Sequence, residues 1–365
     1  MKLPRHAEIW LPAYLRERAR YWSGRPKPKR VWVAITDHYE PLGGRVPMER
    51  ALARVGRWQE LWPRIADAAP RDAEGKRPCY SFFYPQEEYR AELLEPLAEM
   101  TRLGVGDVEV HIHHDQETRE GFVQKMTEFC RCLREDHGLL HDHRGKMVFG
   151  FIHGNWALDN SRPDGRMCGV AGEIELLRDL GCYADFTMPS LPSPTQGKVV
   201  NQVYWCTQRQ GGRKSYDGGV EATAGGGAQG DLLMITGPVG LRFGGGRLMP
   251  RVEMGEIAAN DVPTKERVRL WLDVAPRVGE DVFVKLYTHG AREDNADALL
   301  GTATRASGLA EMFRWFREIA DEDGIELHWA SAYAMFCAVE AQTGPLNPGA
   351  HRAVTQTAVA GVGRS

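Results

Sequence analysis

The sequence predicts an α/β fold in which parallel strands alternate with helices and form a (β/α) barrel. Short runs of β-branched and aromatic residues alternate along the 365 residues with longer stretches of helical periodicity. About seven or eight such units are expected to give parallel strands joined by right-handed crossovers. The glycine fingerprint of dinucleotide-binding sheets, G-x-G-x-x-G, does not follow the first strand, which favours a barrel over a Rossmann fold.

The predicted strands are short apolar runs, and most of them end in polar residues. The first reads VWVAIT and the fourth reads MVFGFIH, compositions typical of strands that are buried on both faces. The predicted strands, in order, are residues 31–36, 79–84, 107–113, 147–153, 183–187, 232–236, 282–287 and 326–329.

The predicted helices lie between these strands and have apolar residues three and four positions apart. In residues 309–321, for example, Met312, Trp315 and Phe316 share one stripe. The predicted helices are residues 48–67, 87–103, 117–135, 173–180, 265–275 and 309–321, with a last helix ending at Ala341.

The rest of the chain is assigned by composition. Residues 1–30 are expected to form a capping segment with a helix at 11–22, residues 31–341 a single barrel domain, and residues 342–365 a flexible tail. Glycine makes up about a third of residues 211–246, against about 8% elsewhere. We therefore expect a glycine-rich insertion at 211–230, which is either a lid over the barrel mouth or a disordered insertion.

Charge and hydropathy exclude several classes of protein. The net charge of −3, from 46 basic and 49 acidic residues, argues against a general nucleic-acid binder. No apolar run is long enough for a transmembrane helix, although the basic and aromatic N-terminus is compatible with peripheral membrane contact. The N-terminus lacks a secretory signal and the seven cysteines are scattered, so a cytoplasmic location is expected.

Histidines concentrate where the predicted strands end. In a parallel barrel, active-site residues collect at the carboxyl ends of the strands. Six of the twelve histidines fall at such ends: His38, His111, His113, His114, His153 and His289. A second group, His137, His141 and His143, precedes a strand, so we expect it in a solvated loop at the opposite end of the barrel.

The His111-x-His113 pair is the strongest single indication of chemistry. Side chains two residues apart on a strand point to the same side, so both imidazoles can reach one cation. With Asp37 from the first strand they would form a two-His-one-carboxylate site for a divalent metal ion, most simply zinc. The alternative is that both histidines form hydrogen bonds in a polar barrel mouth without metal.

Other residues at the strand ends suggest further roles. His38 or Glu40 could act as general base, and His289 as general acid. Each of these also has a purely structural interpretation, such as a buried, hydrogen-bonded histidine or a loop salt bridge. The candidate substrate-binding residues are Tyr84, His114, His153, Asn155, Trp156 and Asp185.

These motifs resemble the polysaccharide deacetylases, the NodB-like carbohydrate esterases, and in particular a divergent branch of them. The resemblance covers roughly residues 31–332. It rests on DHYEP at 37–41, HIHH at 111–114, HGNWAL at 153–158, Cys168-Gly169 and DFTMPS at 185–190. It implies a distorted (β/α)7 barrel, a divalent metal held by one Asp and two His, and hydrolysis of an N- or O-acetyl group on a sugar. It also implies a carboxylate base and a late-strand His as acid.

The sequence departs from the family pattern at the metal motifs. The usual first motif has two adjacent aspartates, whereas Asp37 is followed here by His38, with Glu40 two residues further on. The usual His motif is H-x-x-x-H, so the ligand pair is either His111 with His113 or His113 with Glu117. Two other functions stay open: another metal-dependent amidohydrolase or phosphoesterase, and a non-catalytic carbohydrate-binding member of a polysaccharide assembly system.

Overall fold

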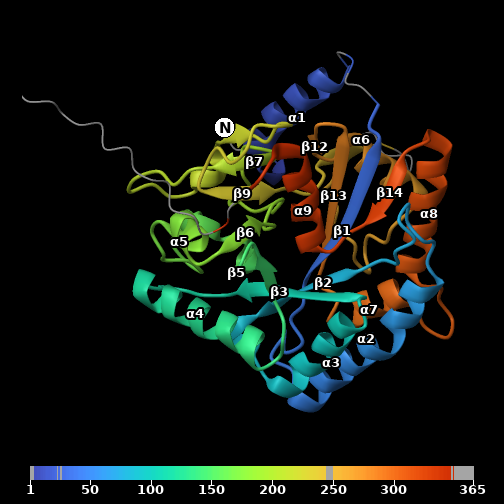
Figure 1. Ribbon diagram of the computed structural model, residues 1–365, viewed down its shortest axis with the longest axis horizontal. Coiled ribbons are helices and arrows are strands. Elements are labelled where there is room, and N and C mark those ends of the chain that lie inside the picture. Colours follow the sequence, from blue (N-terminus) through green and yellow to red (C-terminus); the bar gives the residue numbers. More distant parts are fainter. Residues whose placement is uncertain (1–3, 23, 25–26, 244–249, 347, 349–365) are drawn as a thin grey trace, which may run out of the picture.

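A computed structural model describes residues 4–22, 24, 27–243, 250–346 and 348. It has a mixed α/β architecture around a 12-stranded, mostly parallel sheet, which confirms the α/β part of the predicted fold class (Figure 1). In the sheet, strands β13, β1, β2, β3, β5, β6 and β9 are neighbours in that order and run parallel. Within the described residues no ladder joins β9 back to β13, so a closed barrel is not formed by hydrogen bonds.

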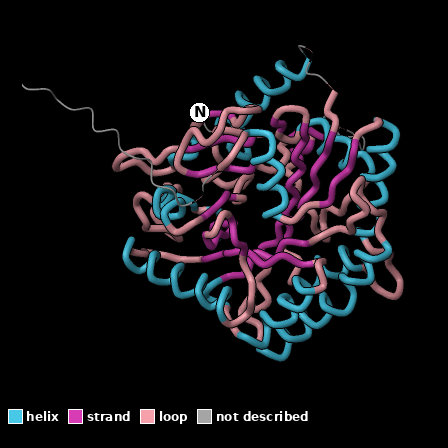
Figure 2. Tube along the Cα trace, viewed as in Figure 1, coloured by secondary structure: helices cyan, strands magenta, loops and turns pink. Residues whose placement is uncertain are grey.

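Strands form at every predicted position, and further short strands lie between them. Figure 2 shows the strands gathered at the centre of the molecule. They are β1 (Arg30–His38), β2 (Tyr80–Pro85), β3 (Gly106–Ile112), β4 (His141–His143), β5 (Lys146–His153), β6 (Cys182–Asp185), β7 (Val203–Cys206), β8 (Val220–Glu221), β9 (Leu232–Ile235), β10 (Gly240–Arg242), β11 (Arg251–Glu253), β12 (Arg277–Val278), β13 (Asp281–Thr288) and β14 (Glu326–Trp329).

Helices connect the strands and cover the sheet. They are α1 (Ala7–Trp22), α2 (Met48–Ala68), α3 (Ala91–Arg102), α4 (Arg119–Glu135), α5 (Glu173–Asp179), α6 (Lys265–Val274), α7 (Glu293–Leu300), α8 (Gly308–Asp323) and α9 (Ala332–Thr343). Figure 1 shows α9 in the middle of the molecule, with α2, α3 and α8 at the periphery.

The two faces of the sheet pack against different helices. Along β1, Val33 and Ile35 join a core cluster with residues of α2, α3, α4 and α8. Ala34, which points the other way, joins a second cluster with Phe336 and other residues of α9. We call these the outer face and the inner face, respectively. Because side chains alternate along a strand, the face that a residue occupies also fixes which functional residues it can meet.

The register of the parallel strands brings their carboxyl ends together. Asp37 lies beside Phe82 of β2, and Pro85 at the end of β2 lies beside His111 of β3. Ile112 in turn lies beside His153 at the end of β5. The polar motifs that follow β1, β2, β3 and β5 are therefore neighbours.

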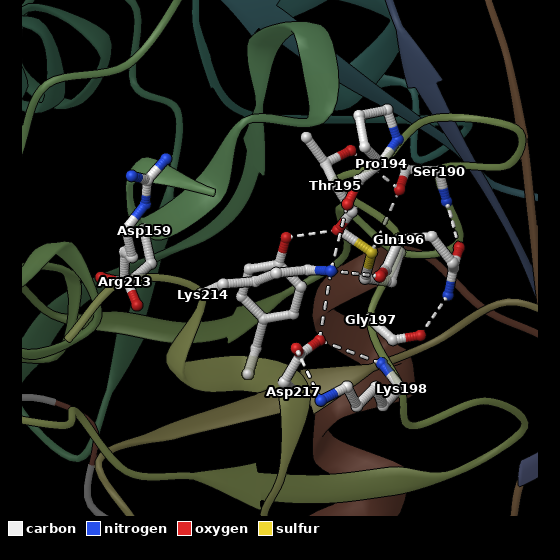
Figure 3. A network of polar contacts seen from close by, with 12 residues as sticks. Asp159, Ser190, Pro194, Thr195, Gln196, Gly197, Lys198, Arg213, Lys214 and Asp217 are labelled. Carbon is white, nitrogen blue, oxygen red and sulfur yellow. Dashed lines mark hydrogen bonds and ion pairs between the residues drawn. The ribbon is translucent and has the colours of Figure 1, made fainter. Parts of the chain in front are cut away.

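The glycine-rich insertion at 211–230 packs against the rest of the chain. Its strand β8 pairs with β7, and Tyr216 is fully buried. Lys214 Nζ donates to the carbonyl oxygens of Pro194 (3.1 Å) and Gln196 (2.6 Å) and lies 3.3 Å from Asp217 (Figure 3). Buried aromatic and lysine contacts therefore anchor a segment whose glycine content indicated a mobile loop.

The prediction of a solvated loop around His137, His141 and His143 is wrong. Residues His141–His143 form β4, which pairs with β5, and His143 is buried. The His141 ring stacks on Tyr333 at 3.9 Å between centroids, and its Nε2 lies 2.9 Å from Asp107 Oδ1. Because Asp107 lies near the start of β3 and His111 near its end, this cluster does lie at the opposite end of the sheet from the site, as predicted.

The N-terminal helix extends over Ala7–Trp22, slightly longer than predicted, and packs Trp10 and Tyr14 against Leu191, Val239 and Val274. None of the described helices is long and apolar enough to cross a membrane. Of the expected flexible tail at 342–365, residues 347 and 349–365 lie outside the described part of the chain.

Candidate functional site

Glu40, His111 and His113 converge at the carboxyl ends of β1 and β3. Glu40 Oε1 lies 3.5 Å from His111 Nε2 and 3.4 Å from His113 Nε2. The two imidazole rings lie 4.6 Å apart between centroids, almost perpendicular to each other. One carboxylate oxygen therefore faces two imidazole nitrogens, which is the donor set of a two-His-one-carboxylate metal site.

The outer ring nitrogen of each imidazole is held by an acceptor. His111 Nδ1 lies 2.8 Å from the carbonyl oxygen of Ile152, and His113 Nδ1 bonds to the Glu87 carboxylate. An Nδ1–H that donates outward leaves the Nε2 lone pair pointing inward, as in metal-ligating histidines. His111 Nε2 is buried and has no hydrogen-bond partner among the described residues. The three residues therefore fit a divalent cation.

Neighbouring charges shift the pKa values of Glu40 and His113. Burial alone would raise the pKa of Glu40, but the imidazoles of His111 and His113 beside its carboxylate outweigh that effect and hold the pKa well below its usual value. Burial would likewise lower the pKa of His113, but Glu40 and Glu87 outweigh it and raise the pKa to about 10. Without metal the His113 imidazole is therefore protonated at neutral pH, and a cation bound beside the ionised Glu40 would take the place of its Nε2 proton.

Asp37, the carboxylate expected to bind metal, does not join this group. Its Oδ2 accepts from the Tyr80 hydroxyl at 2.9 Å, and its Oδ1 accepts from the Gly290 amide at 2.7 Å. The alternation along β1 explains the difference, because Asp37 follows Val33 and Ile35 onto the outer face. Burial raises the pKa of Asp37 to about 7. The hydrogen bond that Asp37 accepts from the Gly290 amide holds the backbone directly after His289.

Glu117, the alternative ligand, also lies apart. Its carboxylate pairs with Lys125 and accepts from the Thr118 amide at 3.0 Å. Of the two ligand pairs that the sequence left open, the structure brings His111 and His113 together.

His38 and His289 stand beside the Glu40 group. Their rings lie 4.8 Å apart between centroids, and the ring of His38 lies 5.1 Å from that of His111. Each can bring a ring nitrogen close to the Glu40 carboxylate. Burial lowers the pKa of both imidazoles, that of His38 well below its usual value, so both are neutral at pH 7. With Glu40 they line a cavity of about 440 Å³ that gives the group access to solvent.

Trp156 and Asn155 follow β5 in an unusual backbone conformation. Both have positive φ, 53° in each case, although neither is glycine. The Trp156 ring lies 6.2 Å from that of His38 and 6.3 Å from that of His289. Its buried Nε1 has no hydrogen-bond partner among the described residues. The indole N–H is thus buried and unpaired next to the two histidines.

Tyr84 and Asp185, expected to bind substrate, are buried inside the protein. The Tyr84 hydroxyl donates to the carbonyl oxygen of Glu88 at 3.0 Å, and the ring is part of the outer core cluster. The Asp185 carboxylate accepts from the amide and hydroxyl of Thr187 at 3.0 and 2.7 Å. Burial raises the pKa of Asp185 to about 7. With their polar atoms satisfied internally, neither presents a surface to a sugar.

His114 and His153, also expected to bind substrate, instead form a second buried group with Glu173. Their Nε2 atoms lie 2.8 Å apart, and Glu173 Oε1 lies 3.3 Å from His114 Nε2 and 3.4 Å from His153 Nε2. Burial would raise the pKa of Glu173, but the two histidines outweigh it and lower the pKa to about 2. The side chains of all three are buried, so they cannot contact a substrate in the cavity.

Neither Glu87, a polar residue just beyond the second predicted strand, nor Glu173 was assigned a role from the sequence. Glu87 stands just after β2, where a polar residue at a strand end could have been paired with His113 of the next strand. Glu173 opens α5, well after β5, and no spacing or motif connects it with His114 or His153.

No family model matches the chain, and a search of curated proteins finds no match. Function must therefore be argued from the geometry of the strand ends and from the resemblance of the motifs.

Proposed function

We propose that the chain is a metal-dependent hydrolase that removes N- or O-acetyl groups from a sugar, built on a distorted (β/α)7 barrel of the polysaccharide deacetylase type. Glu40, His111 and His113 would hold the cation, with zinc the metal proposed from the ligand set. The observation that carries the proposal is the convergence of Glu40 Oε1 with two imidazole Nε2 atoms whose Nδ1 atoms are held from outside.

The neighbouring side chains supply the remaining functions of a hydrolase. A divalent cation, when bound, lowers the pKa of water and polarises a carbonyl oxygen. His38 is neutral and lies beside the Glu40 group, so an imidazole nitrogen of His38 can accept a proton from the attacking water. Glu40 is already engaged by two imidazoles, which favours His38 over Glu40 as the base.

Leaving-group protonation is assigned to His289 and sugar binding to Trp156. His289 lies beside His38 and lines the same cavity, so it can pass a proton to the amine or alcohol that departs as the acyl bond breaks. Trp156 lies beside both histidines and offers an aromatic ring of the kind on which sugar rings pack. The scattered cysteines favour a cytoplasmic setting for this activity.

The test is acetate release from acetylated chitin and xylan oligosaccharides by the purified, zinc-loaded protein. His113→Ala should abolish release, because it removes a ligand. His38→Ala should lower it at least 100-fold while zinc stays bound. His6→Ala, which removes an imidazole near the N-terminus, is the matched control and should leave release unchanged.

Two results would contradict the proposal. Sugar binding without acetate release from any acetylated glycan would indicate a non-catalytic carbohydrate-binding protein. Full activity of His113→Ala, or full zinc content in that variant by elemental analysis, would exclude the assigned centre.

A further inference from the structure

A second group of potential metal ligands lies on the other side of the sheet from the Glu40 group. His114 follows β3, His153 ends β5, and Glu173 begins α5. Phe149 and Phe151 of β5 pack into the outer core cluster, so His153, two residues further on, points to the outer face. His114 packs its ring against Phe122 of α4, a residue of the same outer cluster. The two groups share no residue.

The Nε2 atoms of the two histidines and one carboxylate oxygen of Glu173 form a compact triangle. The separations are 2.8 Å between the two histidine Nε2 atoms, 3.3 Å from His114 Nε2 to Glu173 Oε1, and 3.4 Å from His153 Nε2 to the same oxygen. Ligand bonds of about 2.0–2.2 Å in tetrahedral zinc sites place neighbouring donor atoms about 3.3 Å apart. The triangle therefore needs only a small expansion between the imidazoles to hold the ion.

Backbone groups fix two of the three ligands from outside. His153 Nδ1 lies 2.6 Å from the carbonyl oxygen of Gly154, which directs its Nε2 lone pair toward the other two residues. The second carboxylate oxygen of Glu173 accepts from the Asp159 amide, which leaves Oε1 for the triangle. Both orienting groups belong to the loop that also carries Trp156.

We propose that His114, His153 and Glu173 bind a second divalent cation, zinc by donor type, in a structural site separate from the Glu40 centre. The side chains of His153 and Glu173 are fully buried and that of His114 is 1% exposed, whereas the His113 side chain is 29% exposed. A group closed to solvent in this way cannot admit a substrate, so burial assigns it a structural role. Its three side chains would fill three of the four tetrahedral positions of a zinc ion.

The second cation would tie together three segments that are distant in sequence. It joins the end of β3, the end of β5 and the start of α5. Asp159, which donates its amide to Glu173, also accepts the amides of Lys214 and Ser215. The site therefore braces both the Trp156 loop and the anchored glycine-rich insertion, and its occupancy should raise the thermal stability of the protein.

The experiment is zinc stoichiometry on the full chain, stripped with a chelator, reloaded with Zn²⁺ and freed of excess metal. Elemental analysis should give two equivalents in the wild type, one in His113→Ala, one in Glu173→Gln and none in the double variant. Glu175→Gln is the matched control, because it neutralises an exposed carboxylate on the same helix that pairs with Arg119. It should retain two equivalents.

Thermal unfolding gives an independent readout. In the His113→Ala background, added Zn²⁺ should raise the melting temperature by several degrees, and Glu173→Gln should remove that shift. The single equivalent retained by Glu173→Gln shows that this variant is folded. A His113→Ala variant that binds no zinc, or a Glu173→Gln variant that keeps two equivalents, would overturn the second site. Neither result depends on whether acetate release is ever observed.

Discussion

At the scale of single residues, the direction of each side chain decides which carboxylate joins His111 and His113. Asp37 and His111 both stand at strand ends, yet Asp37 follows the outer face of β1 to Tyr80 while His111 turns inward to Glu40. The alternation of side chains along β1 was visible in the sequence, because Val31, Val33 and Ile35 lie an even number of residues before Asp37 and therefore point to the same face. The sequence does not say which face holds the cavity, so Asp37 and Glu40 could not be separated there.

The carboxylate behind His113 should control zinc affinity at the Glu40 centre. Glu87 accepts from both the Nδ1 and the amide of His113, and such outer partners typically contribute about 10–100-fold to metal affinity. Glu87→Gln should weaken zinc binding by about that factor in a competition titration. The measurement is made in the Glu173→Gln background, so that this centre is observed alone. The exposed Glu92→Gln serves as control, and equal affinities of the Glu87 and Glu92 variants would contradict the role.

Asp37 should make stability depend on pH in a defined direction. Its pKa is about 7 in the folded protein against an ordinary value of 3.8, so between these values only the unfolded chain loses the proton. The stability it contributes is complete below pH 4 and is lost as pH rises through 7. Asp37→Asn stays neutral, so the free energy of unfolding of the wild type should fall relative to that of the variant by at most about 1.4 kcal/mol per pH unit.

Urea unfolding of the metal-free proteins at pH values from 4 to 8 measures this difference. Other titrating groups are common to both proteins and largely cancel in the comparison. A difference that is constant over this range, or that grows in favour of the wild type with rising pH, would contradict the buried state assigned to Asp37.

At the scale of elements, the predicted positions of the parallel strands and long helices agree with the structure, and the short antiparallel pieces were missed. The strand predicted at 326–329 has the bounds of β14, and that at 282–287 lies within β13. The strands β7, β8 and β10–β12 span only two to four residues each, too few for a periodic pattern to show. Helix α7 was also missed. It begins with Glu293 and Asp294 and is only eight residues long, so its apolar stripe is too short to be recognised.

The insertion shows how composition can mislead about an element. Its glycine content predicted mobility, but three non-glycine residues determine how it packs. Lys214 binds carbonyl oxygens at Pro194 and Gln196, Tyr216 is fully buried, and Ser215 donates to Asp159. Contacts of this kind join segments far apart in sequence, so they cannot be predicted from the sequence of the insertion alone.

At the scale of the whole molecule, β1 organises the sheet and α9 covers its inner face. One edge of β1 pairs with β13 along its length, while the other pairs with β14 over residues 30–33 and with β2 over residues 35–38. The sequence AYAMFCAVEAQT is apolar almost all round, as expected of a helix enclosed by other elements. Phe336 and Val339 of α9 pack into the inner cluster with residues of β1, β2, β5 and β13.

This arrangement makes α9 part of the core although it is the last helix in the described part of the chain. The fully buried Phe336 lies 4.9 Å from the Tyr183 ring and 5.3 Å from the His143 ring, between centroids. Phe336→Ala should therefore lower the free energy of unfolding by about 3–5 kcal/mol, because it removes a buried ring and leaves a cavity. Phe243→Ala makes the same chemical change at a side chain that is 75% exposed and should stay within about 0.5 kcal/mol of the wild type. Denaturant unfolding of the wild type and the two variants measures this difference. Equal unfolding midpoints for the two variants would contradict the assignment of α9 to the core.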